Sequence, residues 1–248
     1  MNLYGLIGFP LGHSFSKKYF TKKFREEGLT GCSYELFPIP SIDQFPLLLK
    51  SNLDLKGLNV TLPYKQQVLK YVTETTTAVK EIGAANTIKI TGDKLVAYNT
   101  DVLGFENSFI KNLLPAHTKA LILGTGGASK AVQYVLKKLN IDFLLVTRDQ
   151  PVNDAMINYQ KIDHTIMKNY PVIINCTPVG MYPNDQQYPQ LPYEFLSEKH
   201  YLFDLVYTPE ETMFLKKGKS KGAVTQNGYE MLLIQAEESW KIWNDFSK

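Results

Sequence analysis

Short apolar runs alternate with amphipathic stretches along the chain, and the spacing of the apolar residues predicts the secondary structure. In the first hundred residues, apolar runs predict strands at 3–8, 32–37, 57–60, 86–90 and 94–97. Helical spacing predicts helices over 16–28 and 42–50, and Pro63 is typical of the first turn of another helix. The turn residues at 91–93 lie between two predicted strands and indicate a hairpin. This part of the chain is therefore expected to form a mixed α/β layer.

From residue 101 onward the alternation of strands and helices is more regular. Strands are predicted at 119–123, 143–146, 172–175 and 201–205. Helices are predicted over 102–114, 127–139 and 229–246. Strands that alternate with helices form parallel sheets with right-handed crossovers. We therefore expect an α/β fold of two domains, the first comprising residues 1–100 plus 227–248 and the second residues 101–226.

The composition is that of an ordinary globular protein. Of the 248 residues, 44% are hydrophobic and 21% are charged, which is enough apolar material to exclude intrinsic disorder. The net charge of +3 comes from scattered basic residues and does not indicate a nucleic-acid surface. The chain has no apolar run near the roughly 20 residues of a membrane span, and its start lacks a secretory signal pattern. We therefore expect a cytoplasmic protein that binds neither nucleic acid nor membrane.

The cysteines and histidines do not form a metal-binding pattern. Cys32 and Cys176 lie far apart, without the spacing of a metal or redox motif. The four histidines also lack the spacing of zinc ligands: His13, His117, His164 and His200. We therefore expect no metal site, which disfavours a metal-dependent alcohol dehydrogenase.

A glycine-rich loop joins the predicted strand at 119–123 to the predicted helix at 127–139. Gly124 lets the chain turn tightly after the strand, and Gly126 removes a side chain where a pyrophosphate would approach the backbone. The N–H groups at the start of the helix would then face the anion. Ser129 stands where the usual dinucleotide fingerprint has its third glycine. The pattern favours a Rossmann-type dinucleotide-binding domain, with a plain glycine-rich turn as the alternative.

The end of the following strand bears on the choice between NADP and NAD. In Rossmann-type domains an acidic residue at this point accepts a hydrogen bond from the 2′-hydroxyl of NAD, whereas an arginine pairs with the 2′-phosphate of NADP. Arg148 therefore favours NADP, and the neighbouring Asp149 leaves NAD open. The alternative for Arg148 is an exposed loop charge.

Several polar residues in the first hundred are unusual for a purely structural layer. Ser14 and Ser16 lie in a strand-to-helix turn, where they either cap the helix or offer hydroxyls to a ligand. Asn86 enters a predicted strand, where asparagine is mildly unfavourable and often serves a turn or a ligand. Thr61 is likewise either a helix cap or a ligand.

Lys65 and Asp101 form the candidate pair for acid/base chemistry. Lys65 is expected in the first turn of the helix that begins at Pro63, where the positive end of the helix dipole favours a neutral amine suited to proton transfer. Asp101 begins the next predicted helix, and its carboxylate would orient the ammonium group and hold a substrate hydroxyl. The structural alternatives are a solvated surface lysine and a helix-capping aspartate.

Taken together and in this order, the polar segments resemble those of the shikimate dehydrogenase family. The resemblance covers nearly the whole chain, and the order of the motifs is more specific than any one of them. The motifs are GFPLGHSFS (8–16), NVTLPYK (59–65), GAANT (83–87), NTD (99–101), GTGGAS (124–129), NCTPVGM (175–181), DLVYTP (204–209) and GYEMLLIQA (228–236).

The resemblance implies an NADP-dependent enzyme that reversibly reduces 3-dehydroshikimate to shikimate, a step toward chorismate and the aromatic amino acids. It implies that Lys65 is the general acid/base and is paired with Asp101. The implied shikimate-binding residues are Ser14, Ser16, Thr61, Asn86, Tyr207 and Gln235. The implied cofactor-binding residues are Gly124, Thr125, Gly126, Gly127, Ala128, Thr147, Arg148, Leu205 and Gly228. The first domain would then bind substrate and the second NADP, in a monomer or a homodimer.

Two other hypotheses remain open. A quinate/shikimate dehydrogenase that uses NAD is compatible with Asp149, and Ser14 and Ser16 do not distinguish the two substrates. A nucleotide-binding regulatory module without catalysis is compatible with the fold, because a fold does not imply a function. The presence of both Lys65 and Asp101 argues against the second hypothesis.

Overall fold

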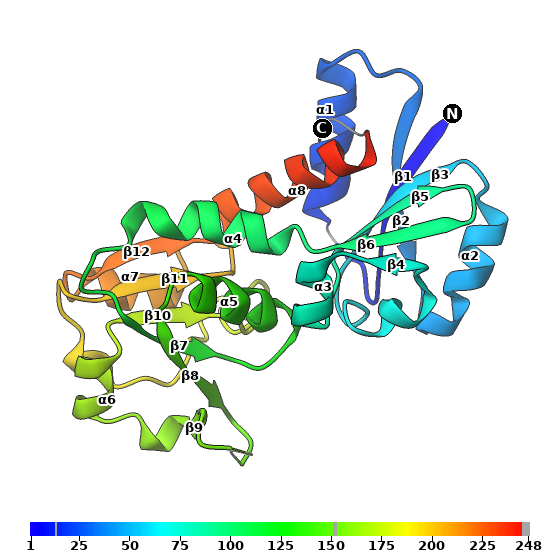
Figure 1. Cartoon of the computed structure of the whole chain (residues 1–248). Helices are drawn as coiled ribbons and strands as arrows, with labels where there is room; N and C mark the ends of the chain where they lie inside the picture. Colours follow the sequence, from blue (N-terminus) through cyan, green and yellow to red (C-terminus); the bar gives the residue numbers. More distant parts are fainter. Residues whose placement is uncertain (13, 151–152, 245–248) are drawn as a thin grey trace. The chain divides into compact units, whose positions relative to one another are not determined.

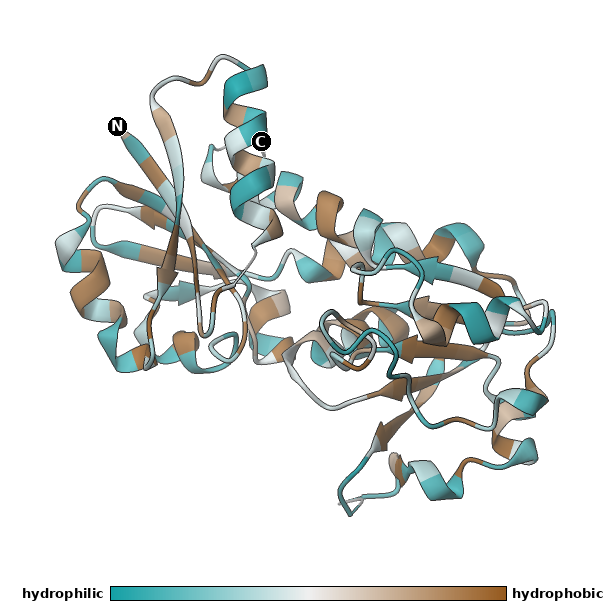
Figure 2. Ribbon diagram, turned by 180° about the vertical axis from the view of Figure 1, so that it is seen from behind, coloured by the Kyte–Doolittle hydropathy of each residue, from teal (hydrophilic) through white to brown (hydrophobic). Residues whose placement is uncertain are grey.

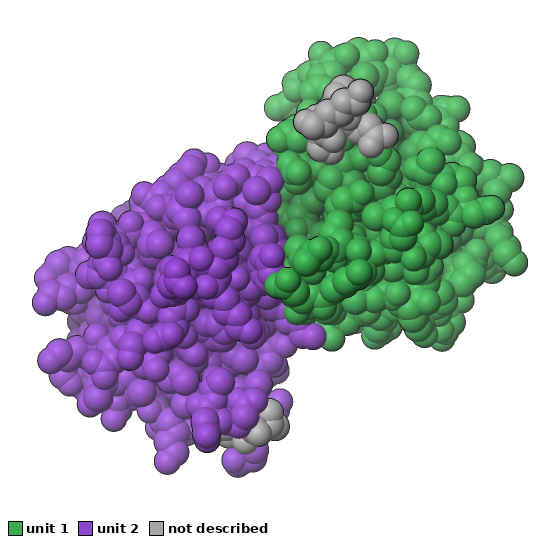
Figure 3. Space-filling model, in the orientation of Figure 1, with its two compact units in different colours: residues 1–100, 235–248 green, residues 101–234 purple. Residues whose placement is uncertain are grey.

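The computed structural model describes residues 1–12, 14–150 and 153–244, which form two compact units (Figure 3). Unit 1 comprises residues 1–100 and 235–248, and unit 2 comprises residues 101–234. Residues 227–234, which we expected in the first domain, belong by their contacts to unit 2. The reason is local packing, because the Gly228 N–H donates to the Val206 carbonyl and Met231 is buried in a core of that unit.

Unit 1 is built on a mixed sheet of six strands in the order β2-β1-β3-β5-β6-β4 (Figure 1). The strands are β1 (Asn2–Gly8), β2 (Cys32–Pro38), β3 (Leu55–Val60), β4 (Glu74–Thr75), β5 (Thr87–Thr91) and β6 (Lys94–Tyr98). β1 pairs in parallel with β2 and β3, whereas β5 pairs antiparallel with β3 and β6. The predicted hairpin at 91–93 is confirmed, because Thr91 pairs with Lys94 and Gly92 has a φ of +58°.

Alternation along β1 divides the apolar side chains of unit 1 between two cores. Ile7 is buried in one core with residues of β3 and β5, whereas Tyr4 and Leu6 are buried in another with α1 and α8. Successive side chains of a strand point to opposite faces, so both faces of this sheet are covered. The helices of unit 1 are α1 (Phe15–Glu26), η1 (Ile42–Gln44), α2 (Phe45–Ser51), η2 (Gln67–Tyr71), α3 (Thr77–Ile82) and the second half of α8 (Tyr229–Trp243).

Unit 2 is built on an all-parallel sheet in the order β12-β11-β10-β7-β8-β9. The strands are β7 (Lys119–Leu123), β8 (Asp142–Thr147), β9 (Met156–Asn158), β10 (Val172–Asn175), β11 (Tyr201–Asp204) and β12 (Val224–Asn227). The helices are α4 (Asp101–Phe109), η3 (Ile110–Asn112), α5 (Gly127–Lys138), η4 (Tyr159–Lys161), α6 (His164–Asn169), η5 (Tyr193–Phe195) and α7 (Met213–Lys219). Strongly hydrophobic central strands, brown in Figure 2, are typical of a sheet buried on both faces.

The expected α/β fold class is confirmed, with a mixed sheet in unit 1 and a Rossmann-like parallel sheet in unit 2. The pattern missed the edge strands β4, β9 and β12, because all three are short and have partly exposed side chains. The short helices α6 and α7 were also not predicted. The predicted end of the last helix at Phe246 lies outside the described residues, and α8 ends at Trp243. Within the described part of the chain, no helix is both long and apolar enough to span a membrane.

Candidate functional site

Two polar segments of unit 1 meet at the carboxyl ends of the parallel strands β1 and β3. The Thr61 N–H donates to the Ile7 carbonyl at 2.9 Å, and the Phe9 N–H donates to the Leu62 carbonyl at 3.1 Å. A Cβ atom added at Gly8 would lie 2.5 Å from Cγ2 of Thr61, so only glycine allows this approach. The strand ends therefore place Thr61 beside Gly8, where the segment that leads to Ser14 and Ser16 begins.

Ser14 and Ser16 have different structural roles. Ser14 is the N-cap of α1, and its hydroxyl accepts a hydrogen bond from the Lys17 N–H at 3.4 Å. Ser14 therefore caps the helix, which is one of the two roles expected for it. Ser16 lies in the first turn of α1, and its side chain forms a hydrogen bond with Tyr34, whose pKa is raised by complete burial. Both serines are half-buried.

The prediction of a helix that begins at Pro63 is wrong. Residues 62–66 form consecutive turns, and only a short 3₁₀-helix, η2, follows. Tyr64 explains the geometry, because its buried side chain donates from Oη to the Ile39 carbonyl at 2.5 Å and anchors the turn to the core. Lys65 precedes η2, so the argument from a helix dipole does not apply to it. The side chain of Lys65 is half-buried.

Backbone and side-chain hydrogen bonds connect Lys65 to Thr100, the residue before Asp101. The Lys65 carbonyl accepts from the Ala85 N–H at 2.7 Å. The next residue, Asn86, accepts from the Thr100 N–H at its Oδ1, also at 2.7 Å, and donates from Nδ2 to the Thr100 hydroxyl at 2.9 Å. Asp101 follows Thr100 in the chain as the first residue of α4 and is buried. Asp101 therefore begins its helix, as the sequence predicts.

Asn86 and Gln235 come together although 149 positions separate them in the sequence. Asn86 immediately precedes β5 and Gln235 lies in α8, and the Asn86 Nδ2 donates to the Gln235 Oε1 at 3.4 Å. Asn86 is 3% exposed and Gln235 is 8% exposed. Two of the residues predicted to contact shikimate therefore belong to one buried polar network inside unit 1.

Besides Thr100, four further members of this network were not among the predicted site residues. Tyr34 donates from Oη to the Asn59 Oδ1 at 2.8 Å, and the Asn59 Nδ2 donates to the Ser239 hydroxyl at 3.0 Å. The hydroxyls of Thr87 and Ser239 lie 2.8 Å apart. Asn59 and Thr87 fall within recognised motifs, which is the signal that could have indicated them. Tyr34 and Ser239 lie outside the motifs, and only the fold brings them here.

In unit 2, the predicted glycine loop joins β7 to α5 through a tight turn. Gly124 follows β7 with a φ of +99°, and a Cβ atom there would lie 2.9 Å from Cγ2 of Thr177. Gly126 is exposed, and an added Cβ would have no atom within 4 Å among the described residues. Helix α5 begins at Gly127, so its first N–H groups lie beside this open space. Two further residues predicted to bind the cofactor lie nearby, Thr125 in this loop and Ala128 in the first turn of α5.

The end of β8 carries the residues expected to distinguish NADP from NAD. Thr147 is buried and its hydroxyl accepts from the Asp149 N–H at 3.1 Å, which closes a tight turn. Arg148 is exposed within this turn, and its charge acts on Tyr159, opposing the rise in the pKa of Tyr159 that burial causes. A guanidinium held at the surface beside a strand end is accessible to a phosphate.

The remaining predicted residues of unit 2 follow β11 and β12. The Leu205 N–H donates to the Asn175 carbonyl at 3.0 Å, and a Cβ atom added at Gly228 would overlap the Leu205 carbonyl oxygen. Leu205 and Gly228 are therefore in close contact. Tyr207 lies two residues after Leu205. It is half-buried, and burial raises its pKa.

A buried carboxylate holds these loops together. Asp204, at the end of β11, has no solvent exposure and accepts hydrogen bonds from Asn175, the Val206 N–H and Thr212 at 2.9, 3.0 and 2.6 Å. Burial raises the pKa of Asp204 to about 6, and the three donors oppose that rise. Asn175 in turn accepts from the Thr177 N–H at 3.1 Å. The cluster therefore links the loops after β10 and β11.

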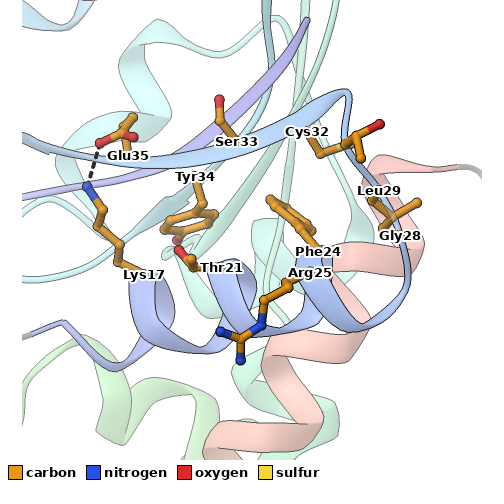
Figure 4. A pocket seen from close by; sticks show the side chains of 11 residues that line it. Lys17, Thr21, Phe24, Arg25, Gly28, Leu29, Cys32, Ser33, Tyr34 and Glu35 are labelled. Atoms are coloured by element: carbon orange, nitrogen blue, oxygen red, sulfur yellow. Dashed lines mark hydrogen bonds and ion pairs between the residues drawn. The ribbon is translucent and has the colours of Figure 1, made fainter.

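A separate groove of about 490 Å³ lies between α1 and β2 of unit 1 (Figure 4). The rings of Phe24 and Tyr34 lie along it, and an ion pair of 2.6 Å joins Lys17 to Glu35 at one end. The residues predicted to bind shikimate are not among the side chains that line this groove. In the described ranges, His, Cys, Asp and Glu residues form no group of three that could hold a metal ion.

Known proteins resemble this chain along almost its full length. Residues 6–88 match the family model of the shikimate dehydrogenase substrate-binding domain. A shikimate dehydrogenase (NADP(+)) from Clostridium botulinum is 33% identical over 250 residues, covering 96% of this chain and 95% of that protein. The crystal structure of shikimate dehydrogenase 1 from Peptoclostridium difficile is 35% identical, covers 100% of this chain and 93% of the other, and has a TM-score of 0.86.

The same architecture also occurs with another substrate and cofactor. A quinate dehydrogenase from Corynebacterium glutamicum, solved in complex with NAD, is 25% identical to this chain. That structure has a TM-score of 0.86, and the match covers 99% of this chain and 94% of the other.

Proposed function

The chain belongs to the shikimate dehydrogenase family, a family of oxidoreductases, and we propose that it catalyses the NADP-dependent reversible reduction of 3-dehydroshikimate to shikimate. The observation that carries this proposal is the hydrogen-bonded connection within unit 1. It ties the backbone of Lys65, through Ala85 and Asn86, to Thr100 and Gln235. Residues from four separate segments of the chain thus belong to one hydrogen-bonded network.

In this proposal unit 1 binds the substrate. Ser14 and Ser16 hold the carboxylate, because two half-buried hydroxyls at a helix N-terminus suit an anion. Thr61, Asn86 and Gln235 contact the ring hydroxyls from the ends of β3 and β5 and from α8. Tyr207 of unit 2 also contacts the substrate.

Lys65 is the proposed general acid/base. Reduction of a ketone leaves an alkoxide, and an ammonium group beside that oxygen stabilises the charge and delivers a proton. In the oxidation direction, by microscopic reversibility, the neutral amine of Lys65 removes the hydroxyl proton. Asp101 is the proposed partner of Lys65, since the residue before it is bound by Asn86. Its carboxylate would orient the ammonium group and hold the same hydroxyl.

Unit 2 fits a dinucleotide. The open space at Gly126 and the start of α5 would receive the pyrophosphate, and Leu205 and Gly228 would line the nicotinamide. When bound, the nicotinamide supplies or accepts the hydride. Thr147 and the accessible guanidinium of Arg148 support NADP as the cofactor, with the 2′-phosphate as the partner of Arg148.

A quinate/shikimate dehydrogenase that uses NAD is the second candidate. Asp149 carries a carboxylate beside Arg148, and the similar quinate dehydrogenase was solved with NAD. Comparing kcat/KM for NADP⁺ and NAD⁺, with shikimate and with quinate, decides between the two. The proposed function predicts the highest value for shikimate with NADP⁺.

Substitution of Lys65 tests the mechanism. Lys65→Ala is expected to abolish turnover while the affinity for NADP⁺, measured by calorimetry, is retained. Lys80→Ala is the matched control, since Lys80 is an exposed lysine of α3. Turnover near the wild-type rate in the Lys65 variant would remove Lys65 from the mechanism. If the purified wild-type protein binds NADP⁺ but shows no shikimate-dependent reduction of it, a nucleotide-binding module without catalysis is favoured.

A further inference from the structure

Ser239 connects the substrate-facing part of α8 to the sheet of unit 1. It lies one helical turn after Gln235, has no solvent exposure, and its hydroxyl donates to the Gln235 carbonyl at 2.9 Å. The same oxygen lies 3.0 Å from the Asn59 Nδ2 and 2.8 Å from the Thr87 hydroxyl. One small side chain thus contacts β3, β5 and the backbone of Gln235 together.

The hydrogen-bonding capacity of each group determines the direction of these bonds. A serine hydroxyl has a single hydrogen, and in Ser239 that hydrogen goes to the Gln235 carbonyl. The Ser239 oxygen must therefore accept from both Asn59 and Thr87. The hydroxyl hydrogen of Thr87 is thereby directed toward Ser239 and away from the Asn86 Oδ1, which lies 3.2 Å from the Thr87 oxygen.

The direction of the hydrogen bond from Thr87 to Ser239 affects Asn86 and Gln235, the two predicted substrate ligands in this network. The Asn86 Oδ1 remains available to the Thr100 N–H, so the amide group of Asn86 keeps Nδ2 turned toward the Gln235 Oε1. Because its Oε1 faces Asn86, Gln235 turns its Nε2 hydrogen-bond donors away from Asn86. Without the Ser239 hydroxyl, the Thr87 hydroxyl loses its acceptor at 2.8 Å and can turn to the Asn86 Oδ1 at 3.2 Å. A second hydrogen bond on that oxygen, beside the one from the Thr100 N–H, would shift the Asn86 amide and with it the contact to Gln235.

Other contacts keep this part of α8 attached to unit 1, independently of Ser239. Trp240 and Trp243 are buried in an aromatic cluster with Tyr4 of β1, and the Trp243 Nε1 donates to the Ile88 carbonyl at 3.0 Å. Figures 1 and 2 show α8 beside α1. There, Lys23 forms an ion pair of 3.0 Å with Glu237. Loss of one hydroxyl at Ser239 should therefore leave the helix in place.

We propose that Ser239 is a positioning residue for shikimate binding that acts through Gln235 and Asn86. The inference rests on the proposed function, because it takes these two amides as substrate ligands. It predicts that Ser239 influences the affinity for substrate and not the affinity for NADP, since every bond described for Ser239 lies within unit 1.

Steady-state kinetics of Ser239→Ala, with shikimate and NADP⁺ varied separately, test the proposal. We expect the KM for shikimate to rise about three- to tenfold, the range that corresponds to losing one neutral hydrogen bond. The KM for NADP⁺ should be unchanged. Glu238→Ala is the matched control, because Glu238 lies in the same helical turn and pairs with Lys241 outside the network. If Ser239→Ala does not fold, Ser239→Cys keeps the side-chain shape with a weakly bonding thiol and serves in its place.

A double-mutant cycle separates positioning from a merely structural role. If Ser239 acts through Gln235, adding Ser239→Ala to Gln235→Ala should raise the KM for shikimate by less than about twofold. An unchanged KM in the single variant, or equal effects with and without Gln235, would overturn the proposal while the proposed function stands. If the wild-type protein shows no shikimate-dependent activity, the proposed function fails and this inference fails with it.

Discussion

The buried carboxylate of Asp204 makes a quantitative prediction about stability and pH. Its folded-state pKa is raised by burial from 3.8 to about 6, although it accepts three hydrogen bonds. Asp204→Asn keeps the shape and removes the charge. The Asn oxygen can accept from Asn175 and Val206, and its amide nitrogen can donate to the Thr212 hydroxyl.

The sign follows from proton binding. The folded chain binds this proton more tightly than the unfolded chain. The free energy of unfolding therefore decreases as the pH rises from 3.8 to about 6, and the full cost of the buried charge remains above about 6. The difference between about 6 and 3.8 is 2.2 pH units. At about 1.4 kcal/mol per unit, the ionised group costs about 3 kcal/mol at pH 7.5. Asp204→Asn should therefore be more stable than the wild type at pH 7.5, and nearly equal to it at pH 4.

Urea unfolding followed by circular dichroism, repeated from pH 4 to pH 7.5, measures this difference. Amide hydrogen exchange at Val206 reports the same change locally, because its N–H is bonded to Asp204. Asp142→Asn, which changes an exposed carboxyl group at the start of β8, should retain the wild-type pH dependence. A constant difference between Asp204→Asn and the wild type across the whole pH range would refute the reasoning.

Three further predictions concern packing and reactivity. Gly57→Ala places a Cβ atom against the indole of Trp243 and should lower the free energy of unfolding in urea by about 1–3 kcal/mol. Gly228→Ala forces the chain away from the Leu205 carbonyl and should weaken NADP⁺ binding in calorimetry more than shikimate binding. Burial raises the pKa of the Cys176 thiol, so its labelling by a maleimide, followed by mass spectrometry, should be slow until urea is added. Rapid labelling of Cys176 in buffer would contradict the raised pKa of this partly buried thiol.

The sequence predicted most of the secondary structure because the apolar periodicity is strong where strands are central. The run at 119–123 and the glycine loop after it correspond to β7 and the start of α5, and the φ of Gly124 agrees with its predicted turn. The edge strand β2 was predicted, whereas the shorter edge strands β4, β9 and β12 and the 3₁₀ segment η2 were missed, since they bury too little apolar surface to leave a clear pattern. The helix expected at Pro63 failed because the anchored side chain of Tyr64 imposes a turn there.

By itself, the sequence determined the family, the fold class and most of the polar residues proposed for the site, because these depend on residue identity, order and local periodicity. Only the tertiary structure joined Asn86 to Gln235 and placed Tyr34 and Ser239 in the same network. The physical reason is that buried polar groups must find hydrogen-bond partners, and those partners come from segments far apart in the chain. Their pairing depends on how the strands and α8 pack, which local sequence patterns do not encode.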